Sequence, residues 1–134
     1  MQRLKNRAQF EAVMAGTTVS RTRHFALHRT ELDAPTAAPA GLGTERTQAL
    51  FAIREPWIGA LVPKRWAKRA VTRNAIKRQI YAVSREFETR LPAAAHVVRL
   101  RAGFDRAHFS SATSDALKHA VRGELLDLFA RAAA

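Results

Sequence analysis

The side chains that could take part in acid–base, metal or covalent chemistry are scattered along this chain of 134 residues. A nuclease that works alone with metal ions needs clustered carboxylates to hold two ions about 4 Å apart. The 11 acidic residues lie far apart instead, and Glu86 and Glu88, two positions apart on an expected helix, point in different directions. Ser110 and Ser111 have no neighbouring base to activate them, and no glycine-rich nucleotide-binding motif is present. We interpret the five histidines as strand or surface residues rather than ligands, so we expect neither catalytic residues nor a metal site in the protein.

Positive charge is the chemical feature that the sequence does concentrate. Lys and Arg number 23 against 11 acidic residues, which gives a formal net charge of +12. Eight of these cations, and no acid, lie between Pro63 and Arg85. They are Lys64, Arg65, Lys68, Arg69, Arg73, Lys77, Arg78 and Arg85. A solvated face that only keeps the protein soluble usually mixes both signs, whereas one-sided clustering is typical of a surface that neutralises phosphates and releases their counterions. The sequence therefore predicts a polyanionic partner, and nucleic acid is the commonest.

Length and composition limit the remaining possibilities. The chain is short for two cores, so we expect one domain over 1–134. Its hydrophobic content of 47% is that of a folded protein, and the absence of cysteine excludes disulfides, thiolate zinc sites and cysteine nucleophiles. No apolar run approaches the roughly 20 residues of a membrane span, and the N-terminus lacks the apolar core of a signal peptide. The expectation is a cytoplasmic protein without a membrane partner.

Apolar spacing predicts the elements that would carry the basic cluster. A helix should begin at Asn6, which forms a capping box with Gln9, and its apolar face should present Phe10, Val13 and Met14. Strands are expected over 23–30, 49–54, 57–62 and 96–101, and a long flexible connection over 33–48.

Two further helices complete the prediction. Ile76, Ile80, Val83 and Phe87 form one apolar stripe on a helix over about 70–89, whose neighbouring arc is basic. A last helix should begin at the N-cap Ser114 and present leucines and valine to the core. The order αβββαβα predicts an α+β fold, a two-layer α/β sandwich with one four-stranded sheet.

The segment KRWAKRAVTRNAIKRQIYAVSREF, residues 64–87, resembles the basic motif and following helix of the protein subunit of bacterial ribonuclease P. The matching residues are Lys64, Arg65, Lys68, Arg69, Ala70, Arg73, Asn74, Lys77 and Arg78. The family usually has another arginine where this chain has Ala75. RLKNRAQFEAVMAG resembles the family's opening helix, with Phe10 at the usual aromatic position, and WIGALVPK is similar to the strand before the motif.

This resemblance implies a fold, a reaction and partners. It implies a left-handed βαβ crossover, although right-handed crossovers are the strong default. It also implies that the protein, one monomer per RNA, assists a large RNA subunit that removes the 5′ leader of precursor tRNA by hydrolysing one phosphodiester. The RNA subunit, with its bound Mg²⁺, would perform the chemistry, and the protein would bind no metal tightly.

The resemblance also assigns two sets of residues. One set would bind the RNA subunit: Lys64, Arg65, Lys68, Arg69, Arg73, Asn74, Lys77 and Arg78. A cleft between the first helix and the sheet would hold the single-stranded leader, with Phe10 as a stacking surface and Ala26 and His28 as lining residues. The simpler interpretation of Phe10, as the core-facing residue of an amphipathic helix, stays open because its spacing fits both.

Three other classes of protein compete with this interpretation. A ribosomal or other structural RNA binder fits the composition equally well, but the RNxxKR helix after a basic loop argues against it. A DNA-recognition helix normally follows another helix after a short turn, whereas here the basic helix follows a strand and Pro63. A protein nuclease acting alone is disfavoured because the carboxylates do not cluster.

Overall fold

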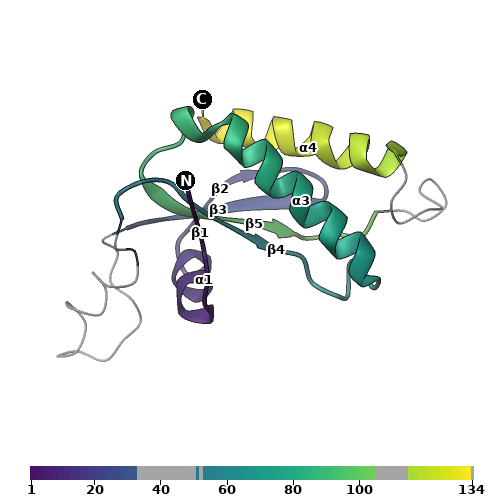
Figure 1. The fold of residues 1–134 in the computed structure, drawn as a ribbon, viewed down its shortest axis with the longest axis horizontal. Helices are drawn as coiled ribbons and strands as arrows, with labels where there is room; N and C mark the ends of the chain where they lie inside the picture. Colours follow the sequence, from purple (N-terminus) through teal and green to yellow (C-terminus); the bar gives the residue numbers. More distant parts are fainter. Residues whose placement is uncertain (33–50, 52, 105–114, 134) are drawn as a thin grey trace.

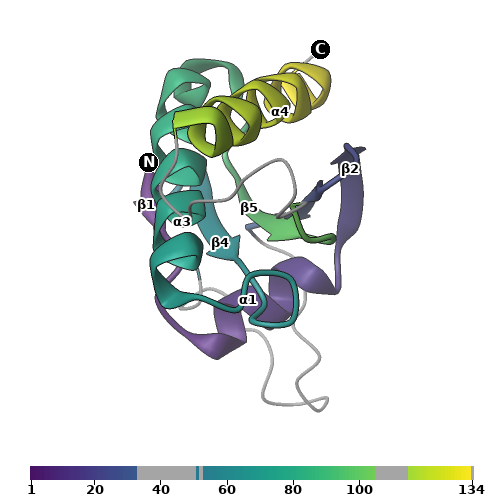
Figure 2. The same ribbon diagram turned by 90° about the vertical axis from the view of Figure 1, so that its right-hand side faces the viewer.

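A computed structural model of the chain describes residues 1–32, 51, 53–104 and 115–133. One twisted sheet separates two layers of helix, with α1 on one face and α3 and α4 side by side on the other (Figures 1 and 2). The predicted connection 33–48 and the predicted cap Ser114 lie outside the described residues. The predicted α+β sandwich is confirmed, and no helix in the described ranges is both long enough and apolar enough to span a bilayer.

The sheet has five strands in the order β1-β4-β5-β3-β2. β1 (Gln2–Arg3) pairs parallel with β4 (Trp57–Leu61), and β4 pairs parallel with β5 (Ala94–Leu100). β3 (Phe25–Glu31) runs antiparallel to β5 and forms a hairpin with the edge strand β2 (Thr17–Arg21). The mixed pairing follows from the connections, because the tight β2–β3 turn reverses the chain while a whole helix lies between β4 and β5.

The crossover from β4 through α3 to β5 is left-handed. In Figure 2 both strands point towards the viewer, β4 lies to the left of β5, and α3 returns above the sheet. A chain that passes from left to right by this route turns against the usual right-handed sense. The handedness implied by the family resemblance is therefore present.

The helices begin and end close to where the sequence predicted. α1 (Arg7–Met14) starts at the capping box of Asn6 and Gln9, in which each side chain accepts from the other residue's backbone N–H. α3 (Ala70–Glu86) is followed by the short 3₁₀ turn η1 (Glu88–Arg90). α4 (Asp115–Ala133) carries Asp115 in its first turn, where a carboxylate stabilises the helix dipole.

The core is divided by the sheet into two apolar clusters. The larger cluster joins the sheet to α3 and α4, and it buries the whole predicted stripe of α3. The smaller cluster lies under α1 and contains Val13, Trp57 and Val97. Because β5 alternates between the clusters, Val97 faces α1 while Val98 and Leu100 face α3 and α4.

The predicted strand pattern was wrong at three places. Within the predicted strand over 49–54, the described residues Phe51, Ile53 and Arg54 lie in a turn and a bend rather than in a strand. β2 was missed because TTVSR is polar and its pairing shifts register between Thr18 and Ser20, which breaks the alternation of a regular strand. β1 was missed because two residues carry no periodic signal, and the sheet consequently has five strands rather than four.

His96 is a buried polar side chain within the larger apolar layer. Its Nε2 accepts a hydrogen bond from Nε of Arg29 (2.9 Å), so its proton lies on Nδ1, which donates to the carbonyl of Trp57 (3.1 Å). Burial, and then the charge of Arg29, lowers the pKa of His96 to about 4. Neutral His96 thus links β3, β5 and β4 through its two ring nitrogens.

The lowered pKa of His96 predicts that the free protein loses stability in mild acid. Between pH 6.5 and about 4, His96 is protonated in the unfolded chain but neutral in the folded protein. The free energy of unfolding therefore falls as pH falls through this window. The expected loss from His96 is about 1.4 kcal/mol per pH unit. Urea unfolding between pH 7 and 5 measures it, and His96→Gln should flatten the profile. An unchanged pH dependence in that variant would contradict the assignment.

Candidate nucleic-acid interface

The basic cluster occupies the loop after β4 and the outer side of α3. Lys64, Arg65, Lys68 and Arg69 are exposed on the loop. Along α3, Asn74 and Arg78 are exposed, whereas Arg73 and Lys77 are half-buried. The apolar stripe of α3 is sealed against the sheet, so the remaining arc of the helix carries the charge outward. The structure thus places the predicted RNA-subunit residues on α3 and the loop that leads into it, and their role in binding stays a prediction.

A groove along α3 concentrates this charge. The groove has a volume of about 350 Å³. Its lining contains four cations and no carboxylate. The lining residues are Arg3, Asn74, Lys77, Arg78, Tyr81, Ala82 and Arg85. Such a groove suits successive phosphates, because guanidinium groups bind phosphate oxygens in pairs and no acid competes.

Arg3 reaches this groove from the other end of the sequence. The pairing of β1 with β4 places Arg3 beside α3, and its guanidinium carbon lies 4.0 Å from the centroid of the Tyr81 ring. This cation–π contact is attractive and orients the guanidinium. Sequence reasoning missed Arg3 and Tyr81 as site residues, because nothing in a two-residue strand indicates that it lies beside the basic helix.

Arg73 has a second role that its position in the motif did not reveal. Its Nη1 donates to the carbonyls of Ala67 (2.9 Å) and Lys68 (2.8 Å), while the backbone N–H groups of Trp66 and Ala67 donate to Pro63. The prediction that Arg73 simply faces solvent was therefore incomplete. Arg73 fixes the basic loop against α3 and so orders the four cations that the loop presents.

The loop also presents an aromatic ring that the sequence prediction passed over. Trp66 is 38% exposed, and the guanidinium of Arg65 lies over its ring at 5.2 Å from the ring centroid. The available signal was a tryptophan placed among cations, a pattern common in proteins that bind single strands.

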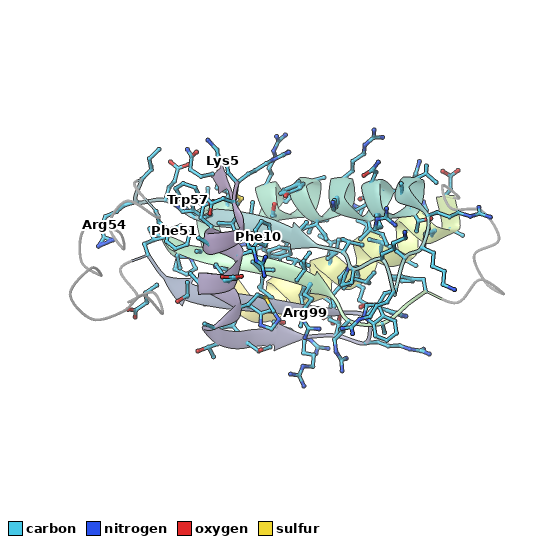
Figure 3. The ribbon with its side chains drawn as sticks, turned by 90° about the horizontal axis from the view of Figure 1, so that it is seen from below. Lys5, Phe10, Phe51, Arg54, Trp57 and Arg99 are labelled. Atoms are coloured by element: carbon cyan, nitrogen blue, oxygen red, sulfur yellow. The ribbon has the colours of Figure 1, made fainter. Side chains whose placement is uncertain are left out.

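The opposite face of the sheet carries the residues predicted for the leader. Phe10 is half-buried, and its ring covers Gly59 so closely that a Cβ at Gly59 would lie 2.7 Å from a ring carbon. Phe10 and Arg99 lie on this same side (Figure 3). Ala26 is fully buried and so offers no surface to a ligand, although it lies on this face as predicted.

His28 is also buried, and both of its ring nitrogens are engaged. Nε of Arg99 donates to Nε2 (3.2 Å), so Nδ1 carries the proton and donates to Oγ1 of Thr18 (3.1 Å). Burial is the main cause that lowers the pKa of His28, and the charges of Arg99 and Arg21 add to it. A neutral ring held edge-on by two partners and 6% exposed is not free to stack on a base in this structure.

The described residues contain no group of three or more His, Asp or Glu side chains that could hold a metal ion. His24 is instead bound to Glu124 through Nδ1 (2.7 Å) and stacks on Phe104.

Comparison with known proteins decides the family. The sequence model of the family described as Ribonuclease P matches residues 1–123. The chain belongs to the ribonuclease P protein family. The Ribonuclease P protein component of Bordetella parapertussis is 32% identical over 131 residues, which cover 98% of this chain and 91% of that protein. That of Ralstonia pickettii is 33% identical over 128 residues, covering 95% of this chain and 76% of that protein.

Solved structures of ribonuclease P proteins share the fold. The RNase P protein of Staphylococcus aureus superposes with a TM-score of 0.63 at 20% identity, covering 97% of this chain and 94% of that one. The protein from Thermotoga maritima gives a TM-score of 0.61 at 20% identity, covering 98% and 97%. The arrangement of strands and helices is thus preserved where four residues in five differ.

The contact between Gly59 and Phe10 predicts the effect of a single methyl group. Gly59→Ala would push Phe10 and Leu4 away from the sheet, because the new Cβ would lie 2.7 Å from each side chain. We expect a loss of about 1–3 kcal/mol in the free energy of unfolding, measured with urea.

Gly123→Ala is the matched control, because a Cβ there meets nothing within 4 Å and the site is an exposed helix position. It should stabilise the protein by about 0.5–1 kcal/mol. Equal effects of the two variants would show that Phe10 does not pack on Gly59.

Proposed function

We propose that this protein is the RNA-binding subunit of a ribonuclease P holoenzyme, in which it assists a catalytic RNA in removing the 5′ leader of precursor tRNA. The observation that carries the proposal is the groove of four cations and no acid along α3, in a chain of this family. Its partners are the RNA subunit and the leader of the substrate, with one protein monomer per RNA.

The α3 surface is the docking site for the RNA subunit in this proposal. Its lining cations are Arg3 on β1 and Lys77, Arg78 and Arg85 on α3, so they follow the helix and can contact more than one phosphate of a strand. The loop ordered by Arg73 extends the same surface by four more cations. Binding of this kind is strongly salt-dependent, because each phosphate contact releases counterions.

The residue types support a division of labour between protein and RNA. Phosphodiester hydrolysis with Mg²⁺ requires oxygen ligands for the ion, and the described protein residues contain no group of three or more His, Asp or Glu that could hold one. Mg²⁺ would therefore be held by the RNA subunit and the substrate, and the protein would contribute no catalytic residue.

The leader would bind on the opposite side of the sheet, beside α1. This side combines the half-buried ring of Phe10 with the guanidinium of Arg99, and single-stranded RNA is recognised by such pairs of stacking surface and cation. Two surfaces on opposite faces of one sheet would allow the protein to hold the RNA subunit and the leader at once.

Cleavage of precursor tRNA at low Mg²⁺ concentration tests the function. Three samples are compared: the protein alone, the cognate RNA subunit alone, and the two together. We expect cleavage that is much faster in the mixture and absent with protein alone. No acceleration by protein shown to be folded would overturn the proposal and favour a structural RNA binder.

Salt dependence tests the α3 surface. Lys77→Ala should lower the slope of log affinity for the RNA subunit against log salt by about one. Arg73→Ala should lower it further, because the loop cations also lose their fixed positions. Filter binding over a range of KCl concentrations measures both, with Lys118→Ala on exposed α4 as the control for charge. Slopes that all equal that of the wild type would remove α3 from the interface.

A further inference from the structure

Two arginine–histidine pairs cross between β3 and β5, one on each face of the sheet. Arg29 donates to His96 on the side of α3 and α4, and Arg99 donates to His28 on the side of α1. In the pair of Arg29 and His96, the histidine is fully buried, and among the described residues Nη2 of Arg29 is the one buried side-chain nitrogen or oxygen without a hydrogen-bond partner. The pair of Arg99 and His28 differs, because Arg99 is half-buried and only its Nε donates a hydrogen bond to a described residue.

A guanidinium at the position of Arg99 is unexpected on structural grounds alone. The position lies in the middle of the sheet, opposite Ala26 on β3 and Leu61 on β4, where an apolar side chain would cost nothing to bury. Its hydrogen-bond partner His28 is neutral, and no described carboxylate forms an ion pair with it. The charge is thus left uncompensated by the described residues on this face.

Arg99 and Phe10 are neighbours on that face. Phe10 covers Gly59, and Arg99 pairs with Leu61, the next residue of β4 on the same side. Arg99 is therefore diagonal to Gly59 across the β4–β5 pairing, so its side chain lies on the sheet beside the strand position that the Phe10 ring covers. A stacking ring and a cation on one face suit a base and a phosphate of single-stranded RNA.

We infer that Arg99 binds a phosphate of the 5′ leader beside Phe10, and that His28 is the residue that positions its guanidinium. The inference rests on the proposed function and names a contact within it. With Nε bound to His28, the plane of the guanidinium is fixed while Nη1 and Nη2 keep their donors for two phosphate oxygens. The Nε–H group of Arg99 can only donate, so His28 carries its proton on Nδ1, and Oγ1 of Thr18 accepts from that proton and holds the ring in place.

Arg99→Gln in the reconstituted holoenzyme tests the phosphate contact. Affinity is measured for precursor tRNA and for mature tRNA over a range of KCl concentrations. We expect precursor binding to weaken by about tenfold and its salt slope to fall by about 0.7, with mature tRNA unaffected. Arg131→Gln removes the same charge from exposed α4, where it pairs with Asp127, and should change neither substrate.

Equal weakening of precursor and mature tRNA by Arg99→Gln, or no weakening of either, would overturn the inference. The proposed function is judged separately, by whether the wild-type protein accelerates cleavage. Full acceleration together with an unaffected Arg99→Gln holoenzyme would leave the function standing and remove Arg99 from the leader site.

The positioning role of His28 is tested by two substitutions. His28→Phe keeps a ring but loses the acceptor, so it should weaken precursor binding without affecting mature tRNA. His28→Gln keeps an acceptor oxygen and should restore most of the affinity. The imidazole ¹⁵N spectrum of the wild type should show the Nδ1–H tautomer. Tighter precursor binding by His28→Phe would identify His28 as a stacking residue and overturn the positioning role.

Discussion

The parallel pairing of β4 with β5 is the constraint on which the rest of this structure depends. Parallel neighbours need a long connection, and here that connection is α3, whose apolar stripe seals one face of the sheet. Sealing that face forces the remaining arc of α3 outward, and that arc carries the basic residues. The position of the basic surface is therefore a consequence of how the hydrophobic core closes.

The other face of the sheet is covered less completely. α1 has eight residues and is about 12 Å long, whereas the seven residues of β5 extend over about 23 Å. The smaller apolar cluster lies beneath α1, and Arg99 marks where polar side chains begin. One domain thus offers a basic groove on one side and, on the other, a partly covered sheet with a ring and a guanidinium. In the proposed function, the groove meets a folded RNA and the sheet face meets a single strand.

Much of this arrangement could be predicted from the sequence. The stripe of Ile76, Ile80 and Val83 located α3, the capping box located α1, and the motif placed the cations on that helix and the loop before it, because these signals are local and periodic. The features that could not be predicted depend on contacts between residues that are distant in the sequence. Arg3 joins the α3 groove only through the two-residue strand β1, and Arg99 meets His28 only through the register of β3 and β5.

The structure also changed the roles assigned to individual residues. Arg73 was predicted as a surface cation, and its side chain instead holds the basic loop through two carbonyls. His28 was predicted to line a cleft, and its ring is buried with both nitrogens engaged. The ring of Phe10 packs on Gly59 as a core-facing residue would, and because it is partly exposed its stacking role stays a prediction.

The central claim is that two RNAs meet opposite faces of one sheet, and directed cleavage tests it most directly. The chain has no cysteine, so a single cysteine at exposed Ala8 on α1 or exposed Ala82 on α3 can carry an Fe–EDTA probe. In the holoenzyme with precursor tRNA, we expect the probe at position 82 to cut the RNA subunit and the probe at position 8 to cut the leader. Cleavage of the same RNA segment by both probes, or the reverse assignment, would contradict the account.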